Sequence, residues 1–135
     1  MILVFLSLIF LCFGSLSSMI IYRLPLMQDN NSKVNLFFPR SHCVACNKTI
    51  SKVNLIPVIG FLLQKGKCNF CKESISPMYP LNELVHLLVG VFLYFVFGLN
   101  IQFFFAYFVF FNFFILFILD LKYFLLPFWL NLGMV

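Results

Sequence analysis

Charged residues are scarce in this chain of 135 residues: they make up 10% of the sequence, and only four of them are Asp or Glu. A soluble domain carries about a quarter charged residues, whereas 63% of this chain is hydrophobic. So short a chain cannot hide that much apolar surface in a single core. The composition therefore excludes an ordinary soluble domain, and its hydrophobicity excludes a disordered chain. We expect the lipid bilayer to be its solvent.

Acidic residues are rare where basic residues are common. Eight of the nine Lys and Arg residues lie between positions 22 and 80, with only Asp29 and Glu73 opposing them. Basic residues accumulate in loops that stay in the cytoplasm, so this insert is predicted to be cytosolic and the N-terminus periplasmic. A nucleic-acid partner is not expected, because binding needs a basic face on a water-exposed fold.

Long uncharged runs predict the membrane segments. Ile2–Ile21 contains no charge and, as a helix, is long enough to cross a bilayer. A cleaved signal peptide is the alternative, although no basic residue precedes Arg23. A second uncharged run, 84–119, is too long for one span and is expected to break at Gly98–Gln102.

These runs predict an all-α polytopic membrane protein with three transmembrane helices and an incomplete fourth. The expected segments are a first helix over 1–21, a cytosolic four-cysteine, zinc-ribbon-like insert over 22–80, helices over 81–100 and 103–121, and the start of a truncated fourth helix over 124–135. The Phe-rich stretch within the third helix is interpreted as a lipid-facing surface.

Four of the five cysteines form two CxxC pairs separated by 21 residues: Cys43, Cys46, Cys68 and Cys71. Two such pairs can supply the four thiolates of a tetrahedral structural zinc site. Redox dithiols, disulfides and unligated thiols are the alternatives, and a cytosolic location disfavours disulfides. His42 could replace one ligand. Cys12 is interpreted as a small apolar residue of the first helix.

Asp120 is the other candidate functional residue. An ionisable group at the end of an apolar helix is costly to desolvate and is a functional candidate for that reason. The alternative is a hydrated carboxylate or one paired with Lys122. His86, near the start of the second helix, is expected to lie at the membrane interface.

Several motifs together make the chain resemble the bacterial type IV prepilin peptidases. They are, in order, Gly14-Ser15, Tyr22-Arg23-Leu24-Pro25, Pro39-Arg40-Ser41-His42 leading into the first Cys pair, Ile56-Pro57-Val58, Lys65-Gly66-Lys67 leading into the second pair, and Ile75-Ser76-Pro77-Met78-Tyr79-Pro80 with Glu83. The resemblance implies a polytopic aspartic peptidase of the bacterial inner membrane. Such enzymes cut leader peptides from prepilins or type II secretion pseudopilins at the cytosolic face, and many also methylate the new N-terminus with S-adenosylmethionine.

The resemblance also implies that Asp120, after Ile118-Leu119 and before Leu126-Pro127, is the first catalytic aspartate. Two departures stand out: Ser18 replaces a usual Asn, and Phe128 replaces an Asp that usually follows Leu-Pro. The Gly-x-Gly-Asp motif with the second catalytic aspartate does not occur in these 135 residues.

Aspartic proteolysis needs two carboxylates in different protonation states. The chain is therefore predicted to be inactive alone, with a separately encoded C-terminal half as a candidate partner. Glu83 is interpreted as part of the boundary motif rather than as the second carboxylate. The alternative functions are a non-catalytic, membrane-anchored zinc module that binds a partner and, less favoured, a thiol–disulfide relay on an exported domain.

Overall fold

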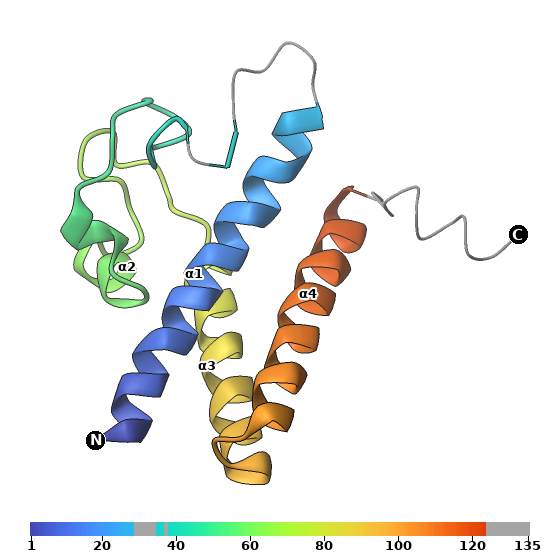
Figure 1. Cartoon of the computed structure of the whole chain (residues 1–135). Coiled ribbons are helices and arrows are strands. Elements are labelled where there is room, and N and C mark those ends of the chain that lie inside the picture. The colour runs from blue at the N-terminus through green and yellow to red at the C-terminus, as the bar shows by residue number, and fades with distance from the viewer. Residues whose placement is uncertain (29–34, 37, 124–135) are drawn as a thin grey trace, which may run out of the picture.

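The computed structural model describes residues 1–28, 35, 36 and 38–123. Its elements, in chain order, are α1 (Ile2–Gln28), the short 3-10 helix η1 (Lys52–Leu55), α2 (Ile59–Leu63), α3 (Met78–Phe97) and α4 (Ile101–Tyr123). The described residues form no strand beyond two isolated bridges, His42 with Thr49 and Lys67 with Ser74. The fold is therefore helical, with an irregular insert between α1 and α3 (Figure 1).

Three helices in the described part of the chain are long and apolar enough to cross a membrane. They are α1 over Ile2–Met27, α3 over Met78–Phe97 and α4 over Ile101–Tyr123. This confirms the predicted fold class of an all-α membrane protein with three spans. The predicted fourth helix, over 124–135, lies outside the described residues.

The first helix is longer than predicted: α1 continues past residue 21 to Gln28. The prediction ended it before Arg23, but Arg23 is buried and its guanidinium donates hydrogen bonds to three carbonyls of the following loop. A charge satisfied in this way does not end a helix. At about 1.5 Å per residue α1 is roughly 40 Å long, so it extends past a hydrocarbon layer about 30 Å thick.

The break between α3 and α4 lies where the sequence predicted it, and local side chains explain its limits. Gly98 adopts a φ of 66° directly after α3, a conformation that glycine adopts without strain. The side-chain oxygen of Asn100 accepts a hydrogen bond from the backbone N–H of Phe103, 3.0 Å away, so Asn100 caps α4. This cap starts α4 at Ile101, two residues before the predicted position.

The closest helix packing is between α1 and α3, which run antiparallel. A Cβ added to Gly14 would lie 2.5 Å from the Cα of Glu83, so only glycine lets the two backbones approach this closely. Further along, a Cβ on Gly90 would lie 2.5 Å from the ring of Phe10. Small residues at helix interfaces allow such contact in membranes, where the hydrophobic effect does not drive helix association.

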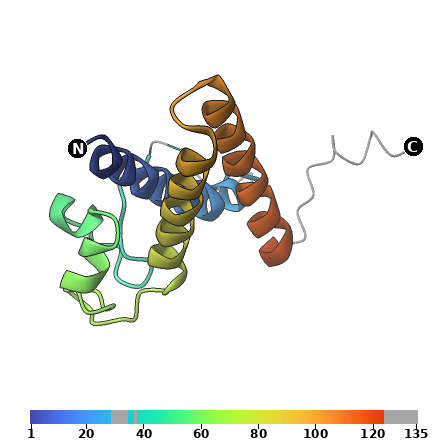
Figure 2. The ribbon, with the colours of Figure 1, turned by 90° about the horizontal axis from the view of Figure 1, so that it is seen from below.

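Helix α4 packs beside this pair and runs parallel to α1. One core cluster joins Leu6 and Phe10 of α1 to Phe103 and Tyr107 of α4. A second joins Ile21 of α1 to Ile115 and Leu119 of α4. Viewed along the bundle, the insert lies against one side of the α1–α3 pair and α4 against the other (Figure 2).

Candidate metal centre and adjoining cavity

The two CxxC segments fold into a pair of matching turns. The backbone N–H of Cys43 donates a hydrogen bond to the carbonyl of Lys48, and the N–H of Asn47 donates one to the carbonyl of Cys43. The second turn has the same two bonds: the N–H of Cys68 donates to the carbonyl of Glu73, and the N–H of Lys72 donates to the carbonyl of Cys68. Asn47 and Lys72 also share positive φ values of 56° and 60°. The same local geometry is therefore built twice.

The two turns face each other and bring the four sulfurs together. The Sγ atoms of Cys43 and Cys71 are 3.7 Å apart, those of Cys46 and Cys68 are 4.0 Å apart, and all four lie within 4.8 Å of one another. A tetrahedral ion with sulfur ligands at about 2.3 Å requires sulfurs about 3.8 Å apart. The distances are too long for a disulfide, whose sulfurs are about 2.0 Å apart. These four residues could hold one metal ion.

The thiols of the second turn differ in acidity. The backbone N–H groups of Cys71 and Phe70 lower the pKa of Cys68 to about 6, from an ordinary 9.0. The N–H of Glu73 lowers the pKa of Cys71, but loss of hydration and the neighbouring thiols outweigh it and raise that pKa to about 12. Of these two thiols, Cys68 is therefore the one that loses its proton more readily, and a metal ion must displace the proton of Cys71 in order to bind it.

A cavity of about 590 Å³ lies between the insert and the helices. Its walls come from α1, the start of α3 and the insert, including Ser15, Tyr79 and Glu83 on the helices and Cys43 and Val58 on the insert. Glu83 is buried, and its Oε2 accepts a hydrogen bond of 2.6 Å from the backbone N–H of Val58. This bond ties the insert to the membrane helices.

Polar side chains are buried where α1 meets α3. The amide of Asn82 donates to the hydroxyl of Ser18, 3.0 Å away, and so links the two helices. Ser17 bonds within α1 to the carbonyl of Gly14, at 2.8 Å. Sequence reasoning missed this cluster, although its signal was present as polar residues on one face of otherwise apolar helices.

His86 is fully buried, which corrects the interfacial position expected from the sequence. Its Nδ1 lies 2.9 Å from the carbonyl oxygen of Asn82, and its ring packs edge-on against Phe110, Phe111 and Phe114 of α4. Its Nε2 has no hydrogen-bond partner among the described residues. The reason is tertiary: α4 covers this face of α3 with aromatic rings.

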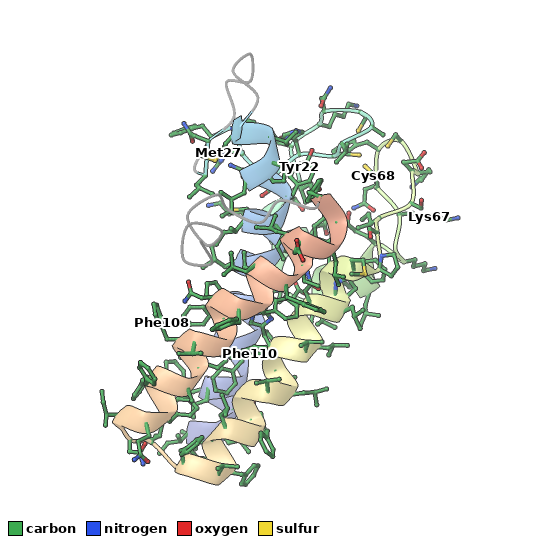
Figure 3. The ribbon with its side chains drawn as sticks, turned by 90° about the vertical axis from the view of Figure 1, so that its right-hand side faces the viewer. Tyr22, Met27, Lys67, Cys68, Phe108 and Phe110 are labelled. Atoms are coloured by element: carbon green, nitrogen blue, oxygen red, sulfur yellow. The ribbon has the colours of Figure 1, made fainter. Side chains whose placement is uncertain are left out.

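Asp120 lies in the last turn of α4 and is half-buried, next to Leu119, which packs against Ile21. This end of α4 lies toward the end of the bundle where α3 begins and where the Cys turns lie. In Figure 3, Cys68 and Tyr22 are near that end, whereas Phe108 and Phe110 of α4 are farther from it. Asp120 does not line the cavity. The structure therefore brings the four cysteines together but leaves Asp120 apart from them.

Comparison with known proteins supports the resemblance. Residues 8–97 match the family model of the bacterial peptidase A24 N-terminal domain. A prepilin leader peptidase/N-methyltransferase of Klebsiella pneumoniae is 46% identical over 80 residues, covering 59% of this chain and 35% of the relative. Proteins with the same description from Legionella pneumophila and Bacillus subtilis are 31% and 34% identical, covering 93% and 70% of this chain and 50% and 38% of their own lengths.

The chain thus spans about a third to a half of the length of these relatives. No solved structure matches it significantly. The family match covers more than half of the chain, from within α1 through the Cys insert to the end of α3. The chain therefore belongs to the bacterial prepilin peptidase family, and its residues 8–97 match that family's peptidase A24 N-terminal domain.

Proposed function

We propose that these 135 residues form the N-terminal part of a prepilin leader peptidase, in which Asp120 is one of the two catalytic carboxylates. The observation that carries the proposal is the family match over residues 8–97, followed by an apolar helix that carries Asp120 in its last turn. The substrates would be prepilins, as the relatives' descriptions suggest, or type II secretion pseudopilins, which the resemblance of the sequence motifs implies.

Asp120 would act with a second carboxylate. One carboxylate takes a proton from water while the other, still protonated, donates one to the scissile amide, and their proximity separates the two pKa values. Among these residues only Asp29 is a second aspartate, and it has no motif around it. Glu83 accepts a hydrogen bond from Val58 of the insert, and the insert lies on the side of the α1–α3 pair away from α4 (Figure 2), which argues against that role. The partner carboxylate would come from a Gly-x-Gly-Asp segment outside this stretch.

The four cysteines would hold a structural zinc ion. Four thiolates fill a tetrahedral shell and leave no position for the water that a catalytic zinc needs. The ion would fix the two turns and, through them, the wall of the cavity formed by Cys43 and Cys68. Methyl transfer from S-adenosylmethionine is implied by the relatives' names alone, and we assign no residue to it.

The Cys insert and Asp120 would face the cytosol across the bacterial inner membrane. The basic residues of the insert and Lys122 at the end of α4 both support this orientation under the positive-inside rule. Since α1 and α4 run parallel and α3 antiparallel, the N-terminus would be periplasmic.

The test is leader cleavage of a prepilin in membranes that contain this chain and a C-terminal segment with the Gly-x-Gly-Asp motif. We expect cleavage with both segments and none with the 135 residues alone. The Asp120→Asn variant should lower the rate by at least about a thousandfold, and the matched Asp29→Asn variant should leave it unchanged. Undiminished cleavage by Asp120→Asn would refute the catalytic assignment.

The close-set cysteines favour a second candidate, a membrane-anchored zinc module that binds a partner without cutting it. It predicts stoichiometric zinc but no leader cleavage when the C-terminal segment is present. Coisolation of an uncleaved prepilin with the chain would then distinguish binding from loss of function.

A further inference from the structure

The linking segment, residues 53–64, joins the two Cys turns and contains no charged residue. It comprises most of η1 and all of α2. Four of its apolar side chains are more than half exposed: Leu62 at 66%, Leu63 at 60%, Val53 at 57% and Ile59 at 51%. A soluble module of this size would not leave so continuous an apolar surface in water without a partner.

The segment is folded, not a loose loop. Gly60 is buried, and a Cβ there would collide with the backbone of Asn54, so α2 lies directly on η1. The side-chain amide of Gln64 donates to the carbonyl of Gly60 at 3.0 Å. The exposed side chains of Ile59, Leu62 and Leu63 are therefore presented by a fixed surface.

The depth of this surface follows from its attachment. Val58 donates its backbone N–H to Glu83, which is the sixth residue of α3 and lies about 7.5 Å along the helix axis from Met78. Val58 also shares the cavity wall with Ser15, near the middle of α1. Figure 1 accordingly shows α2 beside the middle of α1 and not beyond its end. Along the axis of the bundle, the linking segment thus lies within the length of α1 and α3, two of the helices that are able to cross the bilayer.

Basic residues border the segment on both sides. Lys52 precedes it, Lys65 and Lys67 follow it, and all three are exposed. A long Lys side chain can keep its stem on apolar surface while its ammonium group reaches anionic headgroups. An apolar face bordered by lysines is the pattern of a segment that lies in a membrane interface.

We propose that the linking segment inserts into the lipid leaflet nearest the Cys insert, with Ile59, Leu62 and Leu63 among the acyl chains and the flanking lysines at lipid phosphates. Lipid is the occupant because the apolar face lies beside the membrane-capable helices α1 and α3, within their length, and carries positive charge only at its borders. The four-cysteine cluster is thereby anchored at both of its turns to the membrane surface. This inference requires only that α1 and α3 span the bilayer, and not the proposed peptidase activity.

The test uses the full chain in bilayers of phosphatidylglycerol and phosphatidylcholine whose acyl chains carry bromine at a shallow position. Trp129, the single tryptophan, is first changed to Phe. The Leu62→Trp variant should then be quenched by the bromolipid at least about twice as strongly as the matched Phe70→Trp variant, because the latter residue, 58% exposed, lies on the second Cys turn. Acrylamide in the water should quench the two variants in the reverse order.

Two outcomes would overturn the proposal. Equal acrylamide quenching of both variants would mean that the segment lies in water. Weak quenching of Leu62→Trp by both reagents would mean that protein covers it, for example a further membrane segment. The Leu63→Trp variant repeats the measurement one position along, and retained metal content verifies that each variant is folded.

Discussion

The Cys insert and the helix bundle differ in what lies inside them. Among residues 35, 36 and 38–77 only Gly60 and Cys68 are buried, whereas the bundle buries aromatic and branched side chains in two clusters. The described part of the insert has no apolar core of its own. It is held by turns around four thiols and by hydrogen bonds to Arg23 and Glu83 of the helices. The bundle is held by close packing along its length. Small modules without a core commonly depend on a metal ion, and this difference predicts which perturbation each region will resist.

Removing the metal site should have the largest effect, and only on the insert. We expect Cys43→Ser to lose the ion, which in small modules supplies about 10–16 kcal/mol of folding free energy. Trypsin should then cut the insert rapidly at its exposed lysines while the helical content measured by circular dichroism stays nearly constant. Cys12→Ser is the control, since Cys12 is exposed on α1 and outside the cluster. Equal protection of both variants would contradict a metal-dependent insert.

Acidification should have the next largest effect, again on the insert and not on the helix bundle. The Cys68 thiolate stabilises the insert most above its ordinary pKa of 9.0, and this contribution is lost as the pH falls through about 6. The Cys71 thiol, with its pKa near 12, must lose its proton to bind an ion. Metal affinity should therefore fall about tenfold per pH unit for each proton displaced, as chelator competition would measure. Affinity that does not change with pH would rule out thiolate ligation.

Substitution of Gly14 tests the bundle. In Gly14→Ala the new Cβ meets the backbone of Glu83 at 2.5 Å, so α1 and α3 must move apart. We expect a loss of about 1–3 kcal/mol in bundle stability, read from thermal unfolding in detergent. Metal content should be retained. Cys12→Ala, on an exposed position of the same helix, should change stability little. A Gly14→Ala variant as stable as that control would refute the close approach.

The smallest expected effect comes from the buried hydrogen bond between α3 and α1. Asn82→Ala removes the donor to Ser18, and interhelical bonds of this kind contribute about 0.6 kcal/mol on average in membrane proteins. Leu84→Ala, at an exposed position of α3, is the control. The same unfolding measurement would resolve the difference, and a double Ser18→Ala, Asn82→Ala variant should cost no more than the two single changes combined.

Sequence patterns predicted the features that depend on near neighbours. The CxxC spacing was enough to predict the four-cysteine cluster, because each turn closes within a few residues. The break at Gly98 and Asn100 was predictable for the same reason. The end of α1 was not, since Arg23 finds its acceptors 12 to 16 residues away in the loop. The catalytic role of Asp120 stays a prediction.

By itself, the sequence determined that this chain has three segments apolar and long enough to cross a bilayer and two cysteine pairs within one insert, because hydropathy and short spacing are local properties. Only the tertiary structure decided that His86 is enclosed by the rings of α4, that Glu83 receives the N–H of Val58, 25 residues away, and that α2 lies beside the membrane helices. The burial and depth of a residue depend on which other residues it meets after the chain has folded, and no local sequence pattern specifies those neighbours.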